Sequence, residues 1–255
     1  MTRSDRWQRP PEGATFGLAD FLPSLIRQNG IRDVLLRRLA RGPSLQGRTQ
    51  DPQVLALADL ARDRSEKDGT PFWESMMSLA RSEPLEIRTT VFKEALYHRQ
   101  DSDGVEEFWM SSEDFLSVVS GPGFEETDAR SITALTSLVR NSTSETHLPL
   151  LDFRIAPSPE STILLTELLT ILKTDGYLVN SGRSYHFYGG RTLTADDFWK
   201  FLGRSQLMAP FVDDRWIAHQ LISSKAALRI STNAERHTSP PKLVAWSGRF
   251  GAHLQ

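Results

Sequence analysis

A short segment with glycine at both ends, residues 176–190, constrains the fold of this chain more than any other stretch. Residues 177–179 are aromatic or β-branched, and residues 184–188 alternate small or polar side chains with aromatic ones, which is typical of β-strands. Residues 180–182, Asn-Ser-Gly, supply a turn because Asn and Gly tolerate positive φ. The segment therefore predicts two short strands joined by a polar turn.

The second strand of this segment carries polar groups on one face. Ser184, His186 and Tyr188 share that face because side chains alternate along a strand, and Arg183 comes just before them. A hydroxyl, an imidazole and a phenol beside an arginine suit a phosphate or a nucleotide. The alternative is a half-buried strand whose histidine satisfies a neighbouring polar group.

The C-terminal half predicts an α+β fold with a mostly antiparallel sheet. A buried strand over residues 148–155 carries a lone acid, Asp152, and the hairpin follows an amphipathic helix that ends near Lys173. The remaining predicted elements are helices at 195–202, ended at Gly203, and at 215–222, and a strand at 226–230. Strands and helices in this order favour helices flanking a sheet.

The N-terminal half predicts mostly helices. Helical spacing of apolar residues occurs at 18–26 and again at 31–41, where arginines occupy the other face. Further predicted helices cover residues 54–61, 71–79, 112–119 and 128–140. Residues 87–97 and 105–110 predict a hairpin with a long loop, although residues 91–96 also fit a helix.

Composition excludes several classes of chemistry. The chain has no cysteine, so disulfides, thiol catalysis and thiolate metal sites are excluded, and any metal must use Asp, Glu or His. The sequence contains no apolar run of about 18 residues that would span a bilayer. Residues 1–12 are polar and lack the apolar core of a signal peptide. We expect a soluble cytoplasmic protein that does not contact a membrane.

Charge divides the chain into regions. Residues 1–50 carry nine basic against four acidic side chains, and residues 51–128 carry seven basic against eighteen acidic ones. We therefore predict a basic N-terminal arm with helices at 1–50, an acidic helical and hairpin support region at 51–140, and a core at 141–255. The acidic 51–128 stretch or the basic N-terminal helices could dock a protein partner, whereas a solvated face is the alternative.

Basic residues also exceed acidic ones at the C-terminal end. Residues 173–255 carry eleven basic and six acidic side chains, and arginine outnumbers lysine in the chain by 24 to 6. Arginine makes planar forks to phosphate, which favours contact with a polyanion. A coding bias of a genome rich in G and C would give the same excess. Trp199 and Trp246 could stack on bases, although core packing is the alternative for both.

A series of motifs between residues 148 and 244 resembles a known superfamily. An acid at the end of a strand, a helix, a Ser-x-His strand, and later a hydrophobic-Asp step before a Leu-Arg-Ile strand follow in that order. This order is similar to that of the archaeo-eukaryotic primase-polymerase superfamily, and most similar to the bacterial proteins described as primase-like. The resemblance implies an RRM-like, mostly antiparallel sheet flanked by helices, with a helical N-terminal region.

The resemblance also implies metal-binding and catalytic residues. In that superfamily the first motif supplies two acids, one residue apart, for divalent metals, and the hydrophobic-Asp motif adds a third. By position, the resemblance implies that Asp152 and Asp213 are metal ligands. It implies that Asp152, His186 and Asp213 are the catalytic residues. Mg²⁺ or Mn²⁺ is the implied metal.

The same resemblance implies a binding site for a nucleoside triphosphate. The Ser and His of the second motif hold the incoming triphosphate in that superfamily, and a basic residue of the later strand helps. By position these are Ser184, His186 and Arg229, and Arg183 lies beside the pair. A nucleotide or a nucleic acid is therefore the expected partner.

One position departs from the superfamily pattern. Arg154 stands where the second acid of the first motif belongs. A guanidinium there repels divalent cations, which need several oxygen ligands for two-metal phosphoryl transfer. We therefore expect a degenerate metal motif.

Three functions follow from these residues. We expect a primase-polymerase-like protein that binds a nucleotide or a nucleic acid, with lost or weakened nucleotidyltransferase activity. The first alternative is a non-catalytic adaptor that keeps the fold to bind proteins. The second is an active nucleotidyltransferase that uses one metal, or an acid from elsewhere such as Asp214.

Overall fold

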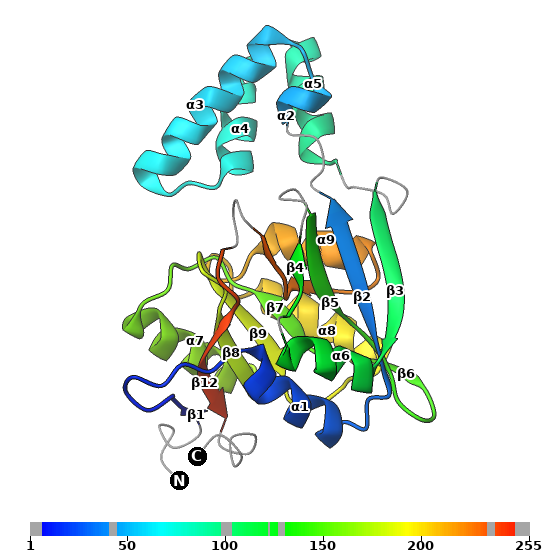
Figure 1. Ribbon diagram of the computed structural model, residues 1–255. Coiled ribbons are helices and arrows are strands. Elements are labelled where there is room, and N and C mark those ends of the chain that lie inside the picture. The colour runs from blue at the N-terminus through cyan, green and yellow to red at the C-terminus, as the bar shows by residue number, and fades with distance from the viewer. Residues whose placement is uncertain are drawn as a thin grey trace. The chain divides into compact units, whose positions relative to one another are not determined.

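The computed structural model forms two compact units (Figure 1). The larger unit comprises residues 1–40 and 105–255, and the smaller unit comprises residues 41–104. The structure describes residues 7–40, 45–97, 104–121, 123–126, 131–233 and 238–247. The fold is α+β with antiparallel five-stranded sheets, as the sequence predicts.

The predicted hairpin lies inside the first sheet of the larger unit. β8 (Gly176–Asn180) and β9 (Tyr185–Gly189) pair antiparallel, with Tyr177 opposite Tyr188 and Val179 opposite His186. The sheet continues on both sides of this hairpin. Its strand order is β1 (Trp7–Gln8), β12 (Lys242–Ser247), β8, β9 and β7 (Leu150–Asp152). We call it sheet A.

The second sheet, called sheet B, lies in the same unit and corrects two predictions. Its order is β10 (Ala227–Arg229), β5 (Ser131–Arg140), β2 (Asp33–Ala40) and β3 (Val105–Ser111), and β6 (Glu145–His147) also pairs with β5. The helices predicted at 31–41 and 128–140 were wrong, because residues 33–40 and 131–140 are strands. A short apolar run is compatible with the spacing of a helix or of a strand. Here hydrogen bonding to neighbouring strands, such as that of β2 to β3 and β5, stabilises the strand.

The predicted hairpin at 87–97 and 105–110 was also wrong. Residues Leu85–Ala95 form helix α5, as the helical alternative predicted, and β3 pairs with β2 instead. The buried side chains of α5 are Ile87, Val91 and Ala95, four residues apart, which places them on one helical face. Residues 98–103 of the predicted loop lie outside the described part of the chain.

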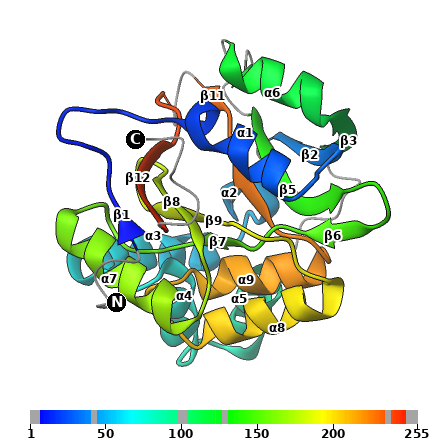
Figure 2. The ribbon, with the colours of Figure 1, turned by 90° about the horizontal axis from the view of Figure 1, so that it is seen from below.

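The helices of the larger unit cover the two sides of sheet A. Figure 2 shows α7, α8 and α9 on one side of strands β7–β9, and α1 and α6 on the other. The bounds are α1 (Leu18–Gln28), α6 (Ser112–Ser120), α7 (Pro159–Ile171), α8 (Ala195–Gln206) and α9 (Asp214–Ile222). Helix α8 passes through Gly203 and does not end there. The ring of Phe21 in α1 stacks on Tyr177 of β8, with centroids 4.6 Å apart.

The smaller unit is helical and has its own core. It contains α2 (Leu45–Arg48), α3 (Pro52–Asp68), α4 (Phe72–Ala80) and α5. Asp51 caps α3 by accepting from the backbone of Gln53 and Val54, and Gly69 ends it in the left-handed conformation. Val54, Ala58 and Met76 are fully buried in its apolar cluster.

The unit division does not follow the three regions predicted from charge. β2 belongs to the predicted region 1–50, β5 to 51–140 and β10 to 141–255, yet the three strands are neighbours in sheet B. Outside the two sheets, β4 (Glu125–Glu126) and β11 (Thr232–Asn233) pair parallel. Among the described residues, no helix has the length and apolarity needed to cross a membrane.

We predict that Gly176→Ala destabilises the larger unit much more than Gly182→Ala. Gly176 has a φ of 158°, and a Cβ there would collide with the carbonyl oxygen of Tyr188. Gly182 has a φ of 109°, but a Cβ would meet nothing within 4 Å. We expect losses of about 2–4 kcal/mol for Gly176→Ala and about 1–2 kcal/mol for Gly182→Ala in urea unfolding. Equal losses would contradict this account of the hairpin.

Candidate functional site

A cavity of about 400 Å³ in the larger unit is the candidate site. Five of the six predicted site residues line it, and Asp213 is not among the lining side chains. These five residues are Asp152, Arg183, Ser184, His186 and Arg229. Asp152 and His186 are in strands of sheet A, and Arg183 and Ser184 are in the turn that precedes β9. Arg229 is in β10 of sheet B. The cavity is therefore formed by both sheets.

Strand pairing brings Asp152 next to the Ser-x-His strand. Asp152 of β7 lies opposite His186 of β9 in the antiparallel register, so both side chains are on the same face of sheet A. The Ser184 hydroxyl donates to Asp152 Oδ1 over 3.4 Å, and His186 Nε2 is 3.9 Å from the same oxygen. His186 is buried, with 6% of its surface exposed. The side chains of Asp152, Ser184 and His186 therefore lie together at the cavity.

Burial and a neighbouring acid make Asp152 a weak acid. Burial raises the pKa of Asp152 to about 7, and the Asp213 carboxylate adds to the rise, whereas Ser184 and Arg229 oppose it. Its side chain is 26% exposed, at the side that faces the cavity. The carboxyl group therefore changes charge near neutral pH.

Asp213 holds the start of α9 and does not line the cavity. Its Oδ1 accepts from the backbone N–H of Trp216 over 2.8 Å, which makes it the N-cap of the helix. Its own N–H donates to the carbonyl oxygen of Asp152 over 3.0 Å. The predicted hydrophobic-Asp residue thus couples the end of β7 to α9.

Arg229 is a buried cation that joins the two sheets. Its side chain is in β10 of sheet B, and one guanidinium nitrogen donates over 2.7 Å to the carbonyl oxygen of Ser181 in the β8–β9 turn. Another donates to the carbonyl oxygen of Ser231. Only 7% of Arg229 is exposed. Within the described part of the chain, no carboxylate lies within ion-pair distance of this guanidinium.

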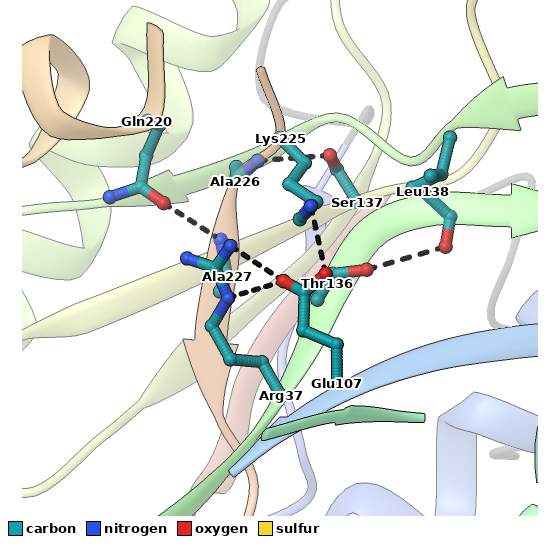
Figure 3. Close-up of polar contacts among 9 residues, drawn as sticks. All are labelled: Arg37, Glu107, Thr136, Ser137, Leu138, Gln220, Lys225, Ala226 and Ala227. Atoms are coloured by element: carbon teal, nitrogen blue, oxygen red, sulfur yellow. Dashed lines mark hydrogen bonds and ion pairs between the residues drawn. The ribbon is translucent and has the colours of Figure 1, made fainter. Parts of the chain in front are cut away.

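Sequence reasoning predicted Arg229 but missed Arg37 of sheet B and the cavity residues of α9. Arg37, assigned to a helix face, is in β2 and lines the cavity. The Glu107 carboxylate accepts from Arg37 Nε at 2.7 Å and pairs with Lys225 Nζ at 2.9 Å (Figure 3). Arg37 and Lys225 therefore contact the same carboxylate. Only the correct strand assignment of residues 33–40 could have revealed Arg37.

Trp216 and Gln220 of α9 also line the cavity. The two tryptophans considered from sequence have other contacts. Trp246 is buried, and its indole donates to the Gln8 side chain over 2.9 Å, whereas Trp199 packs on Phe198.

The residues of this site do not fit a two-metal centre. Among the residues that the structure describes, no three His, Asp or Glu side chains converge to hold a metal ion. Of the two implied ligands, Asp152 favours its neutral form up to pH 7, and Asp213 is used as a helix cap. Arg154 Nη1 lies 3.6 Å from Asp214 Oδ1, so Asp214, the alternative ligand considered from the sequence, is paired with a cation.

The two sheets with this cavity between them define a primase-polymerase-like protein. A family model described as AEP-like, archaeo-eukaryotic primase 1D-like, matches residues 113–242, half of the 255-residue chain. The chain therefore belongs to this family. The match includes all six predicted site residues, whereas Arg37 and the smaller unit lie outside it. No curated protein and no solved structure gives a match.

We predict that Asp152→Asn stabilises the protein at pH 8 more than at pH 5. The folded-state pKa of about 7 lies above the ordinary 3.8, so the contribution of Asp152 to stability is full at low pH and is lost as pH rises through 7. Asn has no charge to bury. The advantage of the variant should grow by about 2 kcal/mol between pH 5 and pH 8, discounted because the carboxyl is partly exposed.

Urea unfolding at several pH values tests this prediction. Asp196→Asn in α8, an exposed acid paired with Lys200, is the matched control and should show little change in its difference from the unaltered protein. A difference for Asp152→Asn that stays constant from pH 5 to pH 8 would refute the raised pKa.

Proposed function

We propose that the cavity binds the phosphates of a nucleoside triphosphate or of a nucleic acid end, and that nucleotidyl transfer is lost or greatly weakened. The main support for this proposal is the environment of Arg229. A buried guanidinium with carbonyl partners and no carboxylate within ion-pair distance, among described residues, lines the cavity beside His186 and Ser184. An anion in the cavity would balance this charge.

The other cavity residues support a phosphate as that anion. Ser184 offers a hydroxyl, His186 an imidazole and Arg183 an exposed guanidinium at the hairpin turn. Hydrogen bonds between charged groups are about twice as strong as neutral ones, and arginine forks match phosphate oxygens. The raised pKa of Asp152, about 7, keeps more of this carboxyl protonated than an exposed Asp at the same pH, which lowers its repulsion of the ligand.

The same residues argue against efficient synthesis. Arg154 occupies the position of a metal-ligating acid in the family pattern, and its nearest acid, Asp214, is 3.6 Å away in an ion pair. Because the donor set does not fit two metal ions, we propose no transfer step. Phosphate binding itself needs no metal ligand from the protein.

Two alternatives remain testable. A protein adaptor would need a docking surface, yet the basic helix expected at 31–41 is a strand and its Arg37 is buried against Glu107. An active one-metal enzyme would rely on Asp152 and Asp213 with Mg²⁺ or Mn²⁺. We place the function in the cytoplasm, where nucleoside triphosphates are made and used.

We predict that Arg183→Ala and His186→Ala each weaken triphosphate binding by roughly 1–3 kcal/mol, because each leaves a phosphate oxygen without its partner. Isothermal titration with ATP, in Mg²⁺ and in EDTA, measures the change. Arg183 is exposed, so its variant should keep the melting temperature, whereas His186 is buried and its variant should also lose stability. Arg191→Ala, another exposed arginine beside a different cavity, is the control.

The contradicting result is an ATP affinity that is unchanged in both Arg183→Ala and His186→Ala, together with a lower melting temperature in His186→Ala. Strand β9 would then have a structural role and no role in binding. The adaptor would then be the better account of the chain.

We predict that purified protein shows no or very weak templated primer extension with Mn²⁺. Loss of one metal-ligating carboxylate removes several kcal/mol of transition-state stabilisation, and about 1.36 kcal/mol corresponds to a tenfold change in rate. Robust extension that disappears in Asp152→Ala would overturn the proposed loss of activity and favour the one-metal enzyme.

A further inference from the structure

Trp216 presents an aromatic ring to the same cavity as the phosphate-binding residues. It is the third residue of α9, is partly exposed and lines the cavity with His186 and Arg229. Its backbone N–H is fixed by the Asp213 cap at 2.8 Å. The position of this indole is therefore tied to β7, which carries Asp152.

A single side chain fixes the distance between Trp216 and the sheet B wall. Gln220 Nε2 donates to the carbonyl oxygen of Trp216, and Gln220 Oε1 accepts from the N–H of Ala227, both over 3.1 Å (Figure 3 shows the second bond). Both ends of the amide are used, and Gln220 is 8% exposed. Helix α9 is thus braced against β10 at the turn that carries Trp216.

Arg229 lies two residues beyond Ala227 on the same face of β10, roughly 6–7 Å along the strand. The indole of Trp216 and the guanidinium of Arg229 line the same cavity of about 400 Å³, which lies in the size range of small-ligand pockets. Ala134 and Ala227 of sheet B, both small residues, also line the cavity.

We propose that Trp216 stacks on the nucleobase of the bound ligand, so that the cavity takes a nucleotide in preference to bare polyphosphate. The inference rests on the proposed function, because the phosphates must already be held at Arg229 and His186. Every base has a π face, and stacking on an aromatic side chain tolerates any base. The ligand class is a purine or pyrimidine nucleoside triphosphate, or a nucleotide at a strand end.

Titration with ATP and with inorganic tripolyphosphate separates the base from the phosphates. The unaltered protein should bind ATP more tightly than tripolyphosphate. Trp216→Ala should weaken ATP about 5- to 100-fold and leave tripolyphosphate within about twofold. Trp216→Phe should keep most of the ATP affinity, and it guards against misfolding of the alanine variant. Arg183→Ala, the matched control, should weaken both ligands.

The outcomes distinguish this inference from the proposed function. Equal affinity of the unaltered protein for the two ligands, or an equal loss of both in Trp216→Ala, overturns stacking while phosphate binding stands. No binding of either ligand by the unaltered protein overturns both. ATP should also quench tryptophan fluorescence, and this quenching should decrease in Trp216→Phe, which retains five of the six tryptophans. Quenching that is undiminished in this variant would count against Trp216.

Discussion

The buried guanidinium of Arg229 is the interaction on which the candidate site depends. It reaches from β10 in sheet B to the carbonyl oxygen of Ser181 in the hairpin turn of sheet A, so one side chain links the two sheets that form the cavity. Carbonyl dipoles offset only part of the cost of burying a full charge. The remaining positive charge lines the cavity together with Asp152, whose pKa of about 7 leaves this carboxyl partly protonated near neutral pH. A cavity with this balance favours anions, which agrees with membership of a primase-like family.

The sheets tolerate a large insertion because of how two strands pair. β2 ends at Ala40 and β3 begins at Val105, and Leu39 lies opposite Val105 in the antiparallel register. The two ends of the helical unit, residues 41–104, therefore leave and re-enter the larger unit at neighbouring positions. An insertion whose ends are close together leaves the host sheet intact. The helical unit also has its own cluster of buried apolar side chains, separate from the core of the larger unit.

The acids of the site show how similar motifs can serve different chemistry. Asp152 and Asp213 stand where metal ligands are implied, but one carboxyl is desolvated toward its neutral form and the other caps α9. Arg154 then places a positive charge beside Asp214, which would have been the nearest substitute. Coordination of two dications needs several ionised oxygen ligands with free lone pairs. Among the described residues, a hydroxyl, an imidazole and guanidinium groups line one cavity, and no three His, Asp or Glu side chains converge there.

The sequence by itself determined the hairpin at 176–190 and the shared face of Ser184 and His186, because turn residues and strand alternation are local properties. The sequence also indicated the family, because the order of the motifs along the chain can be recognised without knowing the tertiary contacts. Only the tertiary structure decided that residues 33–40 and 131–140 are strands, because a short apolar run fits a helix or a strand until its partners are known. The same pairing placed Arg37 on the cavity wall, and the brace from Gln220 placed Trp216 there. Such positions depend on hydrogen bonds between segments far apart in the chain, which no local pattern encodes.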